Sequence, residues 1–220
     1  MTLPEPVANT EAAPRIEITP PRRFTNSAVF RLCLYNLALI VPILVSVLVM
    51  TSLPGQWPIL LPFGMIAIAT FFLPFGNGNP SVARLVRSLP DAAAARIEPA
   101  SFIAQVTITP RLRTGLRAVV EDADDVGWLV ILDTGISFRG DSVRLFLPWA
   151  NIRSVRPHDL GLRGIFVHAR SIAVVVSGLP NVESLQFGER SAFILPASRK
   201  IIKDMYRQLT EKSDAARNQR

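Results

Sequence analysis

Few of the residues that build catalytic, metal or disulfide sites are present in this chain. Its single cysteine, Cys33, excludes an intramolecular disulfide, and its two histidines, His158 and His168, lie ten residues apart. A zinc site needs three or four ligands, so no metal site is predicted. The sequence also lacks the phosphate-binding Gly-x-x-x-x-Gly-Lys loop and the Gly-x-Ser-x-Gly elbow of serine hydrolases. We therefore expect no catalytic residues, no cofactor and no enzymatic activity.

Charge is missing from one long segment. No Asp, Glu, Lys or Arg occurs from Leu32 to Ala83. A run of about 18 apolar residues is enough to predict one membrane-spanning helix. This run is longer, and the turn-like residues 51–55 interrupt it. The pattern predicts a transmembrane hairpin over residues 28–76, with spans at about 30–50 and 57–75.

Positive charges predict the orientation of that hairpin. Arginines precede the first span and follow the second, whereas the connecting loop has no charge. Because cytoplasmic flanks carry the excess of Lys and Arg, both termini are expected in the cytoplasm. The predicted location is the cytoplasmic (inner) membrane, as a multi-pass protein. The net charge of +7 and the sequence pI near 10.7 also favour attraction to an anionic bilayer.

The segments that flank the hairpin are interpreted from their composition. Residues 1–27 are rich in proline and predict a disordered tail, although the alternation in residues 16–19 leaves a short strand open. Residues 77–99 form a juxtamembrane linker with apolar residues at helical spacing, which predicts a short amphipathic helix. Two interpretations stay open for that helix: it lies on the membrane surface, or it packs on the domain that follows.

Residues 100–212 have the texture of a separate domain. Short alternating segments are divided by turn signals every 8–12 residues, which predicts an antiparallel barrel or sandwich. The last element differs, because Ile201, Ile202, Met205, Tyr206 and Leu209 form one apolar stripe at helical spacing. We expect a C-terminal helix that caps the barrel, followed by a flexible tail over 213–220. The predicted strands are residues 102–109, 128–132, 136–138, 143–147, 152–155, 164–169, 172–177 and 191–195.

Two short motifs resemble a known family. The segments 131–136 and 147–155, the second containing Pro148-Trp149, resemble bacterial pleckstrin-homology-like modules. Together with the hairpin and the Leu195-Pro196 pair before the last helix, they resemble membrane proteins with a YcxB-like domain. The resemblance implies an α+β protein: a two-helix transmembrane hairpin followed by a pleckstrin-homology-like antiparallel β-barrel or sandwich capped by a C-terminal α-helix. It implies no catalytic residues, and the long stretch 178–190 departs from the shortest members.

One basic cluster stands out in the predicted domain. It spans one strand–loop–strand region, and its side chains can hold an anionic lipid headgroup or an acidic partner by charge-assisted hydrogen bonds. The alternative is a solvated basic face. Aromatic residues are not interleaved with these arginines, so nucleic-acid binding is not expected. The cluster consists of Arg153, Arg156, His158, Arg163, His168 and Arg170.

These observations together predict a class of function. The expected protein is a non-enzymatic, membrane-anchored binding, scaffold or sensing protein that presents its domain at the cytoplasmic membrane face. A protein partner would dock at a barrel edge or beside the C-terminal helix. The alternative is a structural subunit of a membrane protein complex that assembles through its transmembrane helices.

Overall fold

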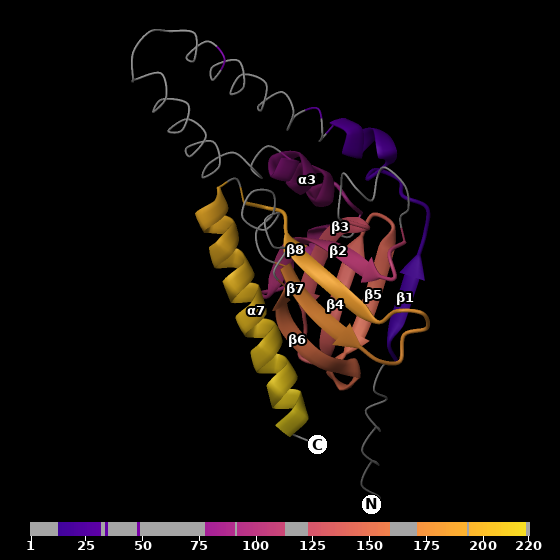
Figure 1. Ribbon diagram of the computed structural model, residues 1–220, viewed down its shortest axis with the longest axis vertical. Coiled ribbons are helices and arrows are strands. Elements are labelled where there is room, and N and C mark those ends of the chain that lie inside the picture. Colours follow the sequence, from indigo (N-terminus) through magenta and orange to yellow (C-terminus); the bar gives the residue numbers. More distant parts are fainter. Residues whose placement is uncertain are drawn as a thin grey trace, which may run out of the picture.

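The computed structural model describes residues 13–31, 34, 48, 78–90, 92–112, 123–158, 171–192 and 194–218. Among these residues, eight strands form one antiparallel sheet in the order β1-β5-β4-β3-β2-β8-β7-β6 (Figure 1). In chain order the elements are β1 (Arg15–Ile18), α3 (Gly78–Arg87), α4 (Ala92–Ile97), β2 (Ser101–Thr109), β3 (Asp125–Ile131), β4 (Gly135–Gly140), β5 (Val143–Pro148), the 3-10 helix η1 (Trp149–Asn151), β6 (Ile152–His158), β7 (Ser171–Val176), β8 (Ser184–Glu189) and α7 (Leu195–Asn218).

The sheet curls around its main core. Phe138 of β4 and Phe187 of β8 have ring centroids 6.1 Å apart, although β3 and β2 separate these strands in the sheet. Only a strongly curved sheet brings such distant strands together. Alternate residues along each strand point to this inner face, and they form one continuous apolar cluster that includes Val106, Leu129 and Val174.

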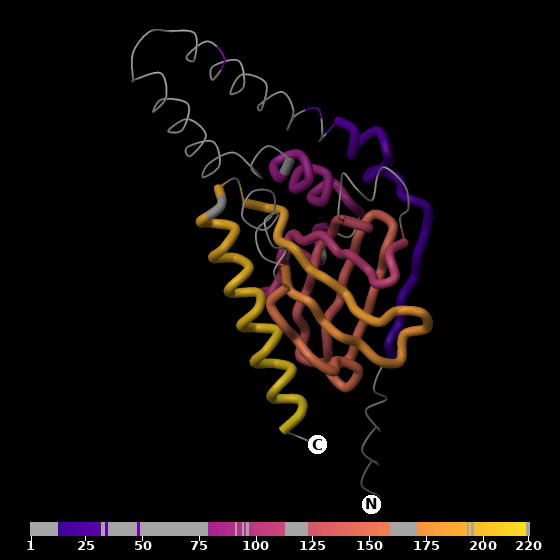
Figure 2. The backbone as a smooth tube through the Cα atoms, in the orientation of Figure 1, coloured from indigo at the N-terminus to yellow at the C-terminus, as the bar shows by residue number. Residues whose placement is uncertain are grey.

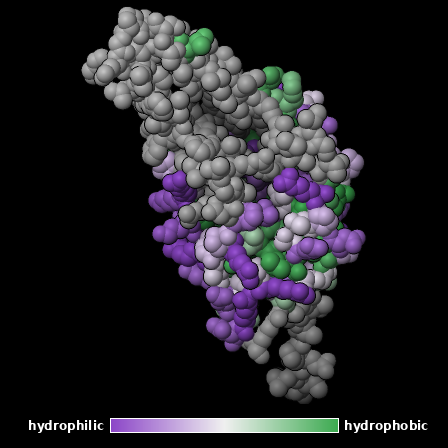
Figure 3. Space-filling model, viewed as in Figure 1, coloured by the Kyte–Doolittle hydropathy of each residue, from purple (hydrophilic) through white to green (hydrophobic). Residues whose placement is uncertain are grey.

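Helix α7 completes the inner core. Ile202, Met205 and Leu209 lie in the same cluster as the inward-facing strand residues. Each such buried side chain contributes roughly 1.5–3 kcal/mol relative to exposure. The helix lies beside β6 and extends along the sheet (Figure 1). Hydrophilic side chains line the side of the molecule that α7 forms (Figure 3), as expected for a helix with one apolar stripe.

A buried carboxylate holds the connection from β8 into α7. Glu189 Oε1 accepts hydrogen bonds from the Ser191 hydroxyl at 2.6 Å and from the Ala192 backbone N–H at 2.6 Å. Its Oε2 accepts one from the Ser198 hydroxyl at 2.5 Å. Several donors converge on this one side chain, so its charge is compensated and the start of the helix is fixed against the end of the sheet.

The outer face of the sheet carries a second apolar cluster. Val126, Trp128 and Val130 of β3 pack there with Val82 and Val86 of α3. Helices α3 and α4 thus cover the outer face around β3. The amphipathic helix expected in residues 77–99 therefore turns its apolar side onto the domain, which is the second of the two interpretations that the sequence left open.

The N-terminal segment joins the sheet at its edge. Strand β1 pairs with β5, from Arg15 opposite Phe146 to Ile18 opposite Val143, so the alternation in residues 16–19 corresponds to a strand. The chain then runs along the edge of the sheet toward α3 (Figure 2). Phe24 is fully buried in the outer cluster. Residues 15–24, which we call the N-terminal arm, thereby tie the sheet edge to the helical layer.

The predicted closed barrel or sandwich is wrong. The sheet is open, because its order ends at β1 on one side and β6 on the other. Two features account for the open sheet. Strand β1 occupies the edge of β5 that barrel closure would use, and α7 covers the curled sheet from β8 to β6 and η1.

The predicted C-terminal helix is confirmed and is longer than expected, since it continues to Asn218.

The predicted transmembrane hairpin is contradicted. Among the described residues, no helix combines the length and the apolar character needed to cross a membrane. Helices α3 and α4 have 10 and 6 residues, against the roughly 20 that a span needs. Helix α7 has 24 residues but carries charged side chains along its length. Most of residues 30–50 and 57–75 lie outside the described residues.

Two further predictions depended on that hairpin. The multi-pass location in the inner membrane is contradicted by the same finding. The alternative function, a subunit that assembles through transmembrane helices, is not tested by the described residues. The prediction had rested on hydropathy and flanking charge alone, without any packing information.

Most of the predicted strands in residues 100–177 match observed ones, with one clear exception later in the chain. None of the described residues of 191–195 lies in a strand, and Leu195 begins α7. The strand β8 instead lies in residues 184–189, inside the stretch 178–190 that departs from the shortest members of the family that the chain resembles. Segment 164–169 lies outside the described residues.

Candidate functional site

The basic cluster expected from the sequence is only partly described. Arg153, Arg156 and His158 lie on β6, which forms one edge of the sheet. The other three residues of the cluster, Arg163, His168 and Arg170, lie outside the described residues. The convergence of all six side chains therefore stays a prediction.

On β6 itself the three residues are not equivalent. Arg153 lies where the register shifts between Ile152 and Ser154, and its carbonyl accepts a hydrogen bond from Arg217 of α7. Arg156 and His158 are two residues apart and share one face of the strand. A bulge and Pro157 interrupt this edge, and both features disfavour the addition of another strand. A partner strand at β6 is thus less favoured than the sequence suggested.

A second set of arginines lies at the opposite end of the sheet. Arg139 of β4 pairs with Arg144 of β5 in the ladder, and Glu17 of β1 pairs with Arg144. Directly paired residues project from the same face. Trp128, which pairs with Arg139, belongs to the outer cluster. The two arginines therefore lie on the outer face, next to the part that α3 covers.

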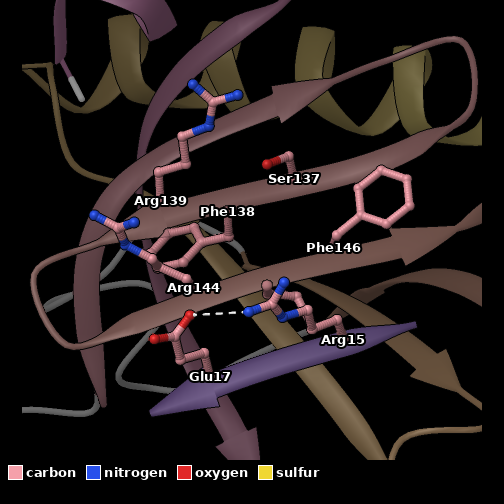
Figure 4. A pocket seen from close by; sticks show the side chains of 8 residues that line it. Arg15, Glu17, Ser137, Phe138, Arg139, Arg144 and Phe146 are labelled. Carbon is pink, nitrogen blue, oxygen red and sulfur yellow. Dashed lines mark ion pairs between the residues drawn. The ribbon is translucent and has the colours of Figure 1, made fainter. Parts of the chain in front are cut away.

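The neighbouring row of the same face is less charged. Ser137 of β4 pairs with Phe146 of β5, which pairs with Arg15 of β1. The close-up view shows Arg139, Arg144, Ser137 and Phe146 on three adjacent strands with Arg15 and Glu17 (Figure 4). This arrangement places an aromatic ring and a hydroxyl beside the guanidinium groups.

Two adjoining cavities lie over this face. The first has a volume of about 400 Å³ and the second about 300 Å³. Both are lined by Glu17, Arg139 and Arg144, so we treat them as one feature, the arginine groove. Its first part is lined by Arg15, Glu17, Ser137, Phe138, Arg139, Arg144, Leu145 and Phe146. Its second part is lined by Glu17, Thr19, Arg22, Arg23, Leu89, Pro90, Trp128, Arg139, Gly140, Asp141, Ser142 and Arg144.

Positive charge predominates in the arginine groove. Its lining includes five arginines but only two acidic residues, Glu17 and Asp141. Glu17 lies 3.6 Å from the guanidinium of Arg15. The half-buried Arg139 has no hydrogen-bond or ion-pair partner among the described residues. A guanidinium that is partly removed from water without a partner is unfavourable, so this site favours an anionic group.

Asp141 holds the N-terminal arm in place along the groove. Its Oδ2 accepts the backbone N–H groups of Arg23 at 2.7 Å and Phe24 at 2.8 Å. Arg23 Nη1 donates to the Ser88 carbonyl at 2.7 Å, which ties the arm to the end of α3. The arm supplies Arg15, Arg22 and Arg23 to the groove. One carboxylate in a turn thus positions much of the cationic wall.

A second carboxylate holds the turn itself. Asp125 is fully buried, and its Oδ2 accepts the backbone N–H groups of Ser142 and Val143 at 2.7 Å each. Burial raises the pKa of Asp125 from 3.8 to about 6, and these two hydrogen bonds oppose the rise. A Cβ atom at Gly140 would overlap the Asp125 carboxylate, so only glycine fits there. The β4–β5 turn, and with it Arg139 and Arg144, is therefore built around Asp125.

The arginine groove was missed by the sequence analysis, although a signal for it exists. Arg139 and Arg144 are placed symmetrically about the Asp141-Ser142 turn. A two-residue hairpin pairs residues at equal distances from its turn, so these arginines could have been paired from the sequence. No such signal exists for Arg15, Arg22 and Arg23, which the sequence analysis used only to orient the hairpin.

No protein-family model, no curated protein and no solved structure matches the chain. The resemblance to pleckstrin-homology-like and YcxB-like domains therefore stays a prediction. Within the described part of the chain, no group of three or more His, Cys, Asp or Glu side chains is arranged to hold a metal ion. The functional proposal below therefore rests on the geometry of the arginine groove.

Proposed function

We propose that this protein is a non-enzymatic binding protein that recognises an anionic group in the arginine groove. The observation that carries the proposal is Arg139: a half-buried guanidinium, paired in register with Arg144, that has no partner among the described residues. A carboxylate or phosphate would supply the missing acceptor. Guanidinium groups bind such oxyanions through two parallel N–H donors, which gives direction as well as charge.

The acidic residues of the groove support binding rather than proton transfer. Asp141 accepts two backbone N–H groups of the arm, and Glu17 faces Arg15 on the same strand. Both carboxylates thus have structural partners. On the side of β1 the groove is open to solvent, since Arg15 and Glu17 are exposed. An open cationic surface of this kind suits reversible association with an anionic partner.

The first experiment uses pyrophosphate as a probe. Purified full-length protein is titrated with pyrophosphate by isothermal titration calorimetry, at low and at moderate salt. We expect salt-sensitive binding that the double variant Arg139→Gln, Arg144→Gln weakens at least about tenfold, since each charged hydrogen bond contributes about 1.5–3 kcal/mol. Arg144 is exposed and Arg139 is half-buried, so the free energy of unfolding of the variant should lie within about 1 kcal/mol of that of the parent.

The matched control is Arg153→Gln, Arg156→Gln. It removes the same charge from β6, at the other end of the sheet. The control should bind pyrophosphate as the parent does. The opposite result, with binding lost only in the control, would contradict the arginine groove. It would favour the basic residues of β6 as a second candidate for the same chemistry, because Arg153 and Arg156 are exposed on that edge strand.

A further inference from the structure

The cations of the arginine groove are arranged in rows. Arg15 belongs to the row of Phe146 and Ser137, and Arg139 and Arg144 form the next row. The two rows are two residues apart along the strands. Because a strand rises about 3.3–3.4 Å per residue, the rows are about 6.7 Å apart along the strands, and Arg15 and Arg144 also lie on neighbouring strands about 4.8 Å apart across the sheet. Arg22 and Arg23 line the groove further along, beyond the β4–β5 turn.

The spacing of the rows along the strands matches the spacing of alternate side chains in an extended peptide. Side chains at alternate positions of an extended chain point the same way and are also about 6.7 Å apart. We infer that the arginine groove binds an extended acidic peptide, with Asp or Glu at alternate positions, lying over the outer face of β4, β5 and β1. This inference rests on the proposed function, and it names the class of ligand.

The uncharged lining of the groove favours a peptide over an inorganic polyanion. Phe146 and Ser137 line the first part together with the arginines, in the same row as Arg15. Leu89, Pro90 and Trp128 line the second part. Apolar surface of this kind is used by the aliphatic portions of side chains and by the peptide backbone, whereas a phosphate chain gains nothing from it.

A substitution at Glu17 should change the affinity for an acidic peptide in the opposite direction to a substitution of the arginines. Its carboxylate lies in the same row as Arg139 and Arg144, and it lines both parts of the groove. An acidic peptide in the groove is repelled by this group. Glu17→Gln should therefore raise the affinity for an acidic peptide, whereas a basic or neutral ligand would lose affinity or be unaffected.

The test compares two peptides of identical composition. Fluorescein-labelled Gly-Glu-Thr-Glu-Thr-Glu-Gly carries glutamates at alternate positions, and its isomer Gly-Glu-Glu-Glu-Thr-Thr-Gly carries them in one block. Binding to the full-length protein is measured by fluorescence anisotropy. We expect the alternating peptide to bind at least about fivefold more tightly than its isomer. Arg139→Gln should weaken it about tenfold, Glu17→Gln should strengthen it, and Arg156→Gln should leave it unchanged.

The possible outcomes distinguish a failure of this inference alone from a failure of the proposed function. Equal affinity for the two peptides overturns the inference, because charge alone then explains binding. Pyrophosphate binding that depends on Arg139, without peptide binding, also overturns it and leaves the proposed function standing with a phosphate-bearing ligand. Peptide binding that Arg139→Gln does not weaken overturns both, since the site would lie elsewhere. Binding of neither probe contradicts both as well.

Discussion

The outer face of the sheet consists of two halves that differ in what covers them. Around β3, residues such as Val126, Trp128 and Val130 lie beneath α3 and α4. Across β4, β5 and β1, the equivalent positions are occupied by Ser137, Arg139, Arg144 and other polar or half-buried side chains. The strands alternate in the same way in both halves. The comparison shows that this one face contributes to the apolar packing where it is covered and carries the arginine groove where it is open.

Two carboxylates connect the covered half to the open half of the face. Asp125 at the start of β3 holds the β4–β5 turn, and Asp141 in that turn holds the arm. Phe24 at the end of the arm is buried in the covered half. The open half therefore depends on the covered half for its shape, which makes the comparison testable by substitution.

The largest effect is expected in the covered half. Val86 of α3 is fully buried, so Val86→Asp places a carboxylate in an apolar layer without a partner. We expect the free energy of unfolding to fall by about 4 kcal/mol or more, since an unpaired buried charge is among the costliest substitutions. Urea denaturation measures the change. Arg84→Asp, at an exposed position of the same helix, is the control and should change stability by less than about 1 kcal/mol.

If Val86→Asp proved as mild as its control, the helical layer would contribute little to stability. The distinction between a covered and an open half would then fail.

The next effect concerns pH and the buried carboxylate at the boundary. The pKa of Asp125 is about 6 in the folded protein against 3.8 ordinarily, so the folded state binds this proton more tightly than the unfolded chain does. Its contribution to stability is complete below pH 4 and is lost as pH rises to about 6. A difference of about two pKa units corresponds to about 3 kcal/mol.

Asp125→Asn isolates that contribution, because the amide is neutral throughout and keeps an acceptor oxygen. Denaturation of parent and variant is measured from pH 4 to pH 7. The parent should lose stability relative to the variant across this range. A difference that does not change with pH would contradict a raised pKa at Asp125.

A smaller effect is expected from the carboxylate that fastens the arm. Asp141→Ala removes the acceptor for the N–H groups of Arg23 and Phe24. We expect a loss of about 2 kcal/mol, as for other hydrogen bonds to a charged group. Hydrogen exchange of residues 15–24 should also become faster, because the arm then loses two of the hydrogen bonds that hold it. Asp214→Ala on α7 removes an exposed i,i+3 ion pair with Arg217 and should cost less than about 0.5 kcal/mol.

Hydropathy alternation predicted much of the domain, and its failures are local. The strands around Trp128, Ile136, Val143 and Ile172 were predicted because their inward residues alternate with others. The strand β8 was not, since its segment contains Gly188 and half-buried polar residues that resemble a loop. Its position in the sheet depends on pairing with β2 and β7, which are distant in the chain. Pairing between distant segments leaves no periodic signal in either one.

The candidate site shows the same limit. The sequence predicts a basic cluster at Arg153, Arg156 and their neighbours because these residues are close together in the chain. The arginine groove combines the arm with a hairpin more than a hundred residues later, through the pairing of β1 with β5. A cluster assembled by long-range pairing is invisible to an analysis that follows the chain. Only the turn between Arg139 and Arg144 offered a local clue.

By itself the sequence determined the alternating strands of the domain and the apolar stripe that places Ile202, Met205 and Leu209 against it, because periodicity and hydrophobicity are local properties. Only the tertiary structure decided that the sheet stays open, that α3 packs on its outer face, and that the arm completes a cationic groove. Those outcomes depend on which distant surfaces bury one another, and that competition is resolved only when the whole chain has folded.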